Sequence, residues 1–191
     1  MKKTIYLTAF VCLMAFSAFA QDKKATDFSG NWTLDVSKSK LDERARIESM
    51  NLTVAQTDKD IKVETATKRL PPPEGAGGGQ GNGQGGGGGR GMGRGGFGGG
   101  DGTNTYTLDG KETSIEEEGR MGKIPVKLKA ELDGGKLKLS AVRTINTPNG
   151  EVSVTTKESW TLSEDGKTLT VKRDTESPRG TNSSEMVFTK K

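Results

Sequence analysis

Histidine is absent from this chain of 191 residues, and its one cysteine, Cys12, lies in an apolar N-terminal stretch. Histidine is the commonest general acid or base in enzymes, and thiols supply nucleophiles, disulfides and soft metal ligands. The rest of the chain therefore has no means for histidine-based or thiol catalysis, for a disulfide or for a Cys/His metal site. We expect a protein that is not an enzyme and that holds no metal and no cofactor.

A strong excess of one charge is also missing. The formal net charge is +4, and Lys2 and Lys3 contribute two of those positive charges. So small a balance gives no electrostatic reason to expect nucleic acid or an anionic membrane as a partner. After residue 20 no apolar run is long enough to cross a bilayer. We expect no nucleic-acid partner and no membrane span in the mature protein.

The first twenty residues have the pattern of an export signal. Two lysines precede an apolar stretch over 5–19, and Ala18-Phe19-Ala20 then supplies a small-x-small cleavage site. Cleavage between Ala20 and Gln21 would leave a short tail at 21–27 ahead of the folded domain. The pattern predicts a periplasmic or secreted protein, and it does not distinguish the two locations.

Residues 70–102 differ in composition from everything around them. Three prolines stand near the start of this segment, and glycine dominates the remainder. A segment with so little apolar content cannot offset the conformational entropy lost on ordering. We expect a disordered Gly-rich insertion within a single domain at 28–191.

Outside that segment, apolar and polar residues alternate with a period of two, as in Trp32, Leu34 and Val36, between turn pairs such as Asp-Gly and Asn-Gly. This pattern is typical of antiparallel strands joined by tight hairpins, and it predicts about ten of them. Only 38–49 has spacing that suits a helix of one or two turns. Closure removes the exposed edges of such a meander, so an all-β, up-and-down barrel of 8–10 strands is the first choice. An open sheet or a sandwich is the second.

Three segments carry a family resemblance. Gly30-Asn31-Trp32 within Phe28–Leu34 resembles the Gly-x-Trp strand that opens lipocalins and fatty-acid-binding proteins. With Tyr106–Lys111 and Trp160–Val171, it resembles the small exported lipocalin-like (calycin-type) proteins of bacteria. The resemblance implies a barrel around a cavity, which sometimes holds a small apolar molecule. It also implies that an arginine from a late strand packs across Trp32, with Arg173 the candidate by position and Arg143 its competitor.

Charged residues fall on strand faces that are otherwise apolar. Arg143, Glu158 and Arg173 share the parity of apolar neighbours such as Leu139, Trp160 and Val171. A buried ion without a partner costs several kcal/mol, so each must be paired or bound to something. One interpretation is a cavity in which Arg143 and Arg173 hold a carboxylate; the other is a salt-bridge cluster near one rim. The acidic run Glu116–Glu118, by contrast, is interpreted as a solvated turn.

The sequence leaves three functions open. The first is an exported lipocalin-like barrel that binds a small hydrophobic, amphipathic or carboxylate-bearing molecule. The second is a non-catalytic structural or interaction module of the cell envelope, with the Gly-rich loop as a flexible contact segment. The third, an enzyme, would have to use Glu158 with Arg143 or Arg173.

Overall fold

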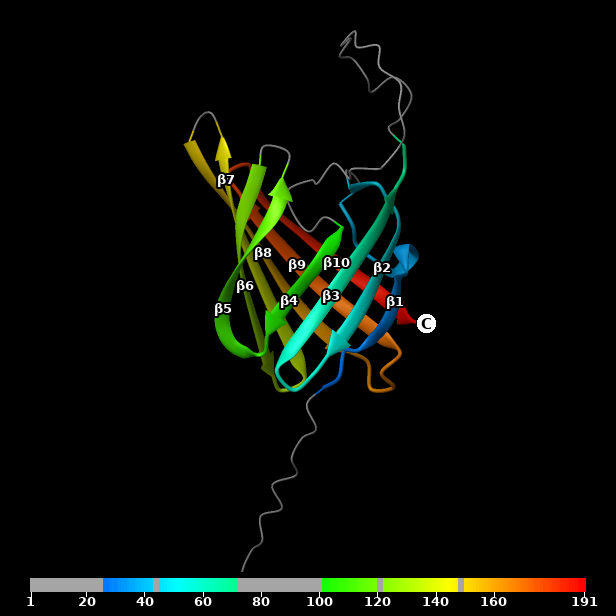
Figure 1. Cartoon of the computed structure of the whole chain (residues 1–191). Helices are drawn as coiled ribbons and strands as arrows, with labels where there is room; N and C mark the ends of the chain where they lie inside the picture. The colour runs from blue at the N-terminus through cyan, green and yellow to red at the C-terminus, as the bar shows by residue number, and fades with distance from the viewer. Residues whose placement is uncertain (1–25, 43–44, 72–100, 120–121, 148–149) are drawn as a thin grey trace, which may run out of the picture.

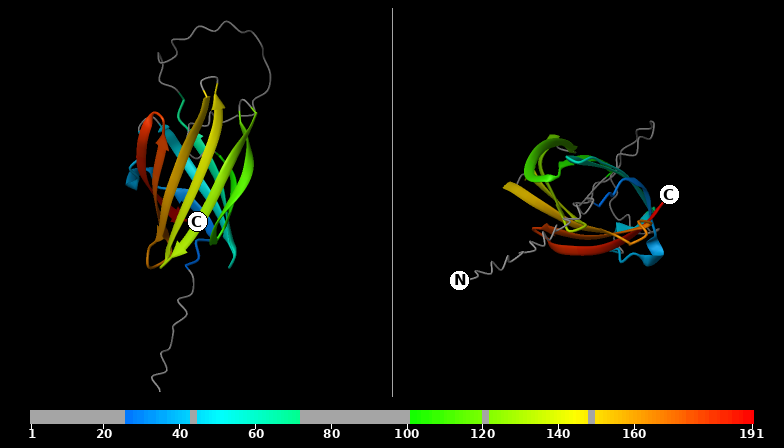
Figure 2. Two further views of the ribbon diagram at one scale, coloured as in Figure 1. Left: turned by 90° about the vertical axis from the view of Figure 1, so that its left-hand side faces the viewer. Right: turned by 90° about the horizontal axis from the view of Figure 1, so that it is seen from below.

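The chain forms one antiparallel sheet of ten strands that curls into a nearly closed barrel (Figures 1 and 2). The computed structural model describes residues 26–42, 45–71, 101–119, 122–147 and 150–191. The strands are β1 (Gly30–Leu34), β2 (Ile47–Gln56), β3 (Asp60–Arg69), β4 (Gly102–Thr107), β5 (Asp109–Gly119), β6 (Gly122–Asp133), β7 (Lys136–Thr147), β8 (Gly150–Leu162), β9 (Thr168–Ser177) and β10 (Gly180–Lys190). The all-β barrel expected from the alternation is confirmed.

Strand order shows how the barrel closes. Strands that follow each other in sequence pair with each other, except β4 and β5. In addition β1 pairs with β10, which places Trp32 opposite Lys190. The two edges of the sheet are therefore β4 and β5, and no ladder joins them among the described residues. The barrel has a seam at this position.

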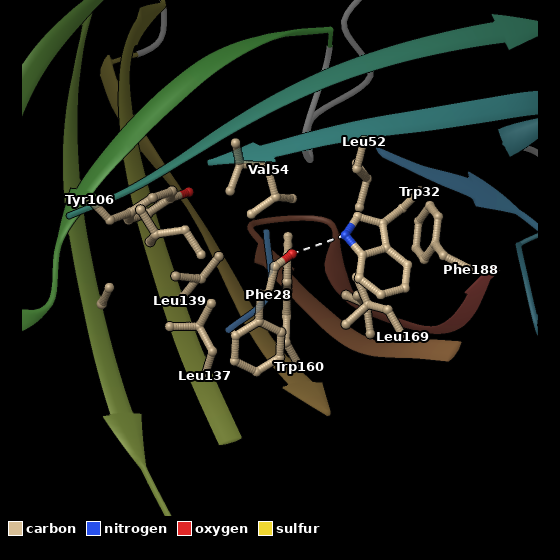
Figure 3. Close-up of a cluster of buried hydrophobic side chains, with 14 of the residues drawn as sticks. Phe28, Trp32, Leu52, Val54, Tyr106, Leu137, Leu139, Trp160, Leu169 and Phe188 are labelled. Carbon is tan, nitrogen blue, oxygen red and sulfur yellow. Dashed lines mark hydrogen bonds between the residues drawn. The ribbon is translucent and has the colours of Figure 1, made fainter. Parts of the chain in front are cut away.

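The start of the described chain closes one end of the barrel, the lower end in Figure 1. Phe28 is fully buried, and its ring meets that of Trp160 edge to face, with centroids 6.2 Å apart. The Trp32 indole N–H donates to the carbonyl oxygen of Phe28 at 3.0 Å, as Figure 3 shows. Gln56 accepts from the Phe28 amide and donates to the carbonyl of Thr26, which fixes this segment against β2.

The core fills much of the barrel interior. Its largest buried side chains are Trp32, Trp160, Phe28, Phe188, Met50, Ile61, Leu128, Leu137, Leu169 and Met186. They point inward because alternate residues of every strand face the barrel axis, which is the periodicity visible in the sequence. The prediction that Val36 continues the inward face of the first strand is wrong. Val36 leaves β1 for a 3₁₀ turn, η1 (Val36–Lys38), and is 42% exposed.

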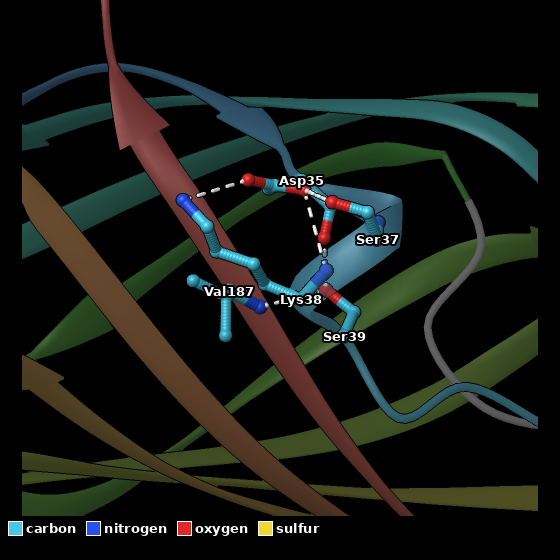
Figure 4. Close-up of polar contacts among 5 residues, drawn as sticks. All are labelled: Asp35, Ser37, Lys38, Ser39 and Val187. Atoms are coloured by element: carbon cyan, nitrogen blue, oxygen red, sulfur yellow. Dashed lines mark hydrogen bonds and ion pairs between the residues drawn. The ribbon is translucent and has the colours of Figure 1, made fainter.

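Asp35 makes the corner after β1 (Figure 4). Its carboxylate accepts from the Ser37 hydroxyl and forms an ion pair with Lys38, and these contacts hold the pKa of the carboxyl below its usual range. The Ser39 hydroxyl then donates to the Asp35 carbonyl and accepts from the amide of Val187 on β10. The helix expected over 38–49 is absent at both ends of that range. Near the first end, Lys40 forms an isolated β-bridge with Glu185, and at the other end β2 begins at Ile47.

Two other predicted segments lie outside the described residues. The predicted signal at 1–20 lies wholly outside them, and nearly all of the predicted Gly-rich insertion does so too. At its far boundary, the Thr67 amide donates to Asp101 at 2.6 Å, and β4 begins at the next residue, Gly102. Among the described residues no helix is long and apolar enough to span a bilayer.

Gly30 provides a test of the Gly-x-Trp motif. Its φ is +142°, and a Cβ at this position would lie 2.6 Å from Cε of Lys190. We expect Gly30→Ala to lower the free energy of unfolding by about 1–3 kcal/mol, because of backbone strain and displacement of Lys190. Urea denaturation measures this change.

Gly180→Ala is the matched control, since Gly180 has a φ of +114° with open space around it. It carries the backbone strain without the clash. A loss of stability in Gly30→Ala no larger than that in Gly180→Ala would contradict a cost from the clash with Lys190.

Candidate functional site

A partly polar pocket lies inside the barrel and shares several of its lining residues with the apolar core. Its lining combines apolar side chains from several strands with Asn104, Arg143, Thr156, Glu158 and Arg173. The apolar members are Leu52, Val63, Leu139, Ala141, Trp160, Val171, Met186 and Phe188. Tyr106 and Thr65 complete the lining. The wall is thus amphipathic, with the ionic groups gathered on β7, β8 and β9.

All three charged residues singled out in the sequence line this pocket. Arg173 and Glu158 stand directly opposite each other on β9 and β8, and the Arg173 Nε donates to Glu158 at 2.6 Å. The second carboxylate oxygen of Glu158 accepts from the Trp160 indole at 2.7 Å. The side chains of Glu158 and Arg173 are 13% and 16% exposed, so this is an interior ion pair. Trp160 connects it to the apolar core.

Arg143 makes a second ion pair, with a partner that the sequence analysis missed. Its Nε and Nη2 donate to the two oxygens of Glu117, each at 2.9 Å. Glu117 belongs to β5 and lies opposite Ile124 on β6, so the prediction of a solvated turn is wrong for this residue. The sequence did contain a signal for this position. Glu117 is two residues after Ile115, which packs against the core, so both side chains share one face of β5.

Thr156 differs from these charged residues because its polar group has no hydrogen-bond partner among the described residues. It is only 4% exposed, and it lines the pocket. It lies on β8 between Ala141 and Thr175, two residues before Glu158. A buried hydroxyl left unpaired costs about 1–3 kcal/mol. Its position identifies a place where a hydrogen-bonding group would be stabilised.

The pocket is small. Its free volume is about 40 Å³, whereas ligand pockets usually have about 300–1,000 Å³. That is room for a few water-sized groups, since each needs about 10–15 Å³. The interior as it stands accommodates a head group and not a whole lipid.

The expected stacking of Arg173 or Arg143 on Trp32 is wrong. Lys190 takes that place, with its Nζ 5.2 Å from the centroid of the Trp32 ring. The register explains why. Lys190 lies opposite Trp32, whereas Arg173 lies opposite Ser184, on the far side of β10 and higher in the barrel. Gly30 and Trp32 therefore serve the closed end of the barrel and not the pocket.

The described residues offer no metal site, because no three His, Cys, Asp or Glu side chains gather in a suitable group. The shifted pKa at the pocket is that of Tyr106. Burial raises it well above the ordinary value, and the nearby Glu158 carboxylate raises it further. Tyr106 therefore stays a neutral phenol.

Tyr106 gives a prediction about alkaline pH. Above its ordinary pKa of 10, the Tyr106 phenol ionises in the unfolded chain but stays protonated in the folded protein. The free energy of unfolding is therefore unaffected by Tyr106 below pH 10 and falls as the pH rises beyond it. We expect Tyr106→Phe to lose less stability per pH unit than the unaltered protein, by at most about 1.4 kcal/mol. Urea denaturation over alkaline pH measures both slopes, and equal slopes would contradict a buried phenol.

No protein-family model matches the chain, and no curated protein matches it. Among solved structures, it is similar to zebrafish ileal bile acid-binding protein in complex with cholic acid. The two are 17% identical, the match covers 86% of this chain and 98% of the other, and the TM-score is 0.46. A likeness at this level carries no argument about the ligand of this chain.

Proposed function

We propose that the barrel binds a small amphipathic molecule, with the polar group of that molecule at Arg143, Thr156 and Arg173. The observation that carries this proposal is the buried Thr156 hydroxyl, which lines the pocket without a partner among the described residues. Beside it, Glu158 is the only side-chain acceptor of Arg173 in the described part of the chain, and it uses Nε alone. The Nη donors of that guanidinium remain for a ligand.

The stability of the fold does not account for this network. Replacing buried ion pairs by well-packed apolar residues of similar size often leaves a protein equally or more stable. An interior ion pair, a second arginine whose partner Glu117 is partly exposed, and an unpaired hydroxyl are better explained by a function at the pocket. An amphipathic ligand fits because the rest of the pocket wall is largely apolar.

The strand order bears on how a ligand would enter the pocket. Tyr106 and Asn104 of the pocket wall belong to β4, an edge strand that is paired on one side only among the described residues. We propose that β4 moves away from β5 to enlarge the pocket for the apolar part of the ligand. The ladders of the other strands then stay intact.

A second candidate function is a packed scaffold that acts through its outer surface. The observation in its favour is the free volume of about 40 Å³. A scaffold of this kind matches the structural or interaction module considered from the sequence. The Gly-rich segment at 72–100, which that hypothesis uses as a contact, lies outside the described residues.

Thr156→Val tests the two candidates together. We expect it to raise the free energy of unfolding by about 1 kcal/mol, because an unpaired buried hydroxyl is removed. We also expect it to weaken binding of octan-1-ol or octanamide about fivefold, since one net hydrogen bond is lost. Urea denaturation gives the stability, and titration followed by tryptophan fluorescence gives the affinity.

Thr155→Val is the control, because Thr155 is the adjacent position on β8 and takes the opposite side-chain parity. Neither its stability nor its binding is expected to change by a comparable amount. If no amphipathic probe binds while Thr156→Val is more stable, the packed scaffold is the correct function.

We also propose that the protein is exported, on the evidence of residues 1–20 alone. Expression of the full chain in a bacterial host with a Sec pathway, followed by N-terminal sequencing, is expected to give a mature start at Gln21. Retention of Met1 in the purified protein would contradict export by this signal.

A further inference from the structure

The charges at the pocket cancel. Arg143 and Arg173 are its cationic groups, Glu158 is its anionic lining residue, and Glu117 binds Arg143 with both carboxylate oxygens. Each arginine therefore already has its own carboxylate, at 2.9 Å for Arg143 and 2.6 Å for Arg173. Among the described residues no other charged side chain lines the pocket.

This cancellation acts against an anionic ligand. A carboxylate placed here either leaves a net negative charge between arginines that are only 14% and 16% exposed, or displaces one of the glutamates from its arginine. Both are unfavourable, because a charge in a low-dielectric interior needs a partner. Displacing Glu117 also breaks a bidentate pair, which is the strongest geometry that an arginine and a carboxylate can adopt.

An uncharged oxygen meets no such opposition. The donors left in the pocket are the Nη groups of Arg173, the remaining N–H groups of Arg143 and the Thr156 hydroxyl, which can also accept. A hydroxyl, amide or ester carbonyl accepts from such donors without adding charge. The volume of about 40 Å³ also suits a group of this size.

We infer that the pocket selects amphipathic molecules with an uncharged oxygen head group, such as an alcohol or an amide, over carboxylates. Glu117 is the residue that sets this selectivity, because its charge neutralises Arg143. The inference rests on the proposed function, and it revises the carboxylate-bearing ligand expected from the sequence. Glu117 acts through Arg143 and need not contact the ligand.

The test compares octan-1-ol and octanamide with octanoate, above neutral pH, where octanoate is ionised. In the unaltered protein we expect the neutral probes to bind at least tenfold more tightly. Glu117→Gln keeps the size of the side chain and one of its two acceptor oxygens, and it removes the charge. In that variant we expect octanoate to gain at least tenfold relative to octan-1-ol.

Two further variants isolate the effect of charge. Glu118→Gln changes the neighbouring exposed residue of β5 and is expected to keep the original preference. The double variant Glu117→Gln/Arg143→Gln restores neutrality and is expected to prefer the neutral probes again. It also serves as the test if Glu117→Gln alone does not fold, because it leaves no unpaired guanidinium at this position.

The outcomes separate the two claims. If neither neutral probe nor octanoate binds any folded variant, the proposed function fails and the inference fails with it. If the unaltered protein binds octanoate at least as tightly as octan-1-ol, ligand binding stands and the selectivity is overturned. If Glu117→Gln leaves the preference unchanged, Glu117 does not set it.

Discussion

The hydrogen bond from the Trp32 indole to the carbonyl of Phe28 holds the closed end of the barrel together. It is buried, so both groups would be left unsatisfied if the chain entered at another angle. With this bond in place, the Phe28 ring packs edge to face against Trp160 at this end of the barrel. The pocket lies where the apolar core meets Arg143, Glu158 and Arg173.

Trp160 takes part in both the apolar core and the pocket. Its ring packs in the apolar core, and its indole nitrogen donates to Glu158, which in turn accepts from Arg173. The Glu158–Arg173 ion pair is therefore bonded to a side chain that packs against Phe28. This arrangement gives the pocket a rigid floor, whereas β4 forms a wall that is paired on one side only among the described residues. This combination agrees with the proposed movement of β4, which would change the volume of the pocket and leave the Glu158–Arg173 pair in place.

Much of this fold could be predicted from the sequence, because alternation along a strand decides which residues face inward. The same parity rule placed Arg143, Glu158 and Arg173 at the interior, and the structure brings them to one pocket. Their role in binding a ligand stays a prediction. Partners across strands could not be predicted, since they depend on register. Arg143 could equally have met Glu158, and Lys190 could not be recognised as the neighbour of Trp32 until β10 was aligned with β1.

The pairing of β1 with β10 has a consequence for how the protein folds. Strands near the two ends of the described chain must meet before the ten-stranded sheet is complete, although hairpins between them can form locally. Bringing such distant segments together costs chain entropy before the contacts are gained. The other ladders join strands that follow each other in sequence, so the pairing of β1 with β10 is the one that we expect to form last among the described strands. Until then β1 lacks one of its two neighbouring strands, and the cation above Trp32 is missing as well.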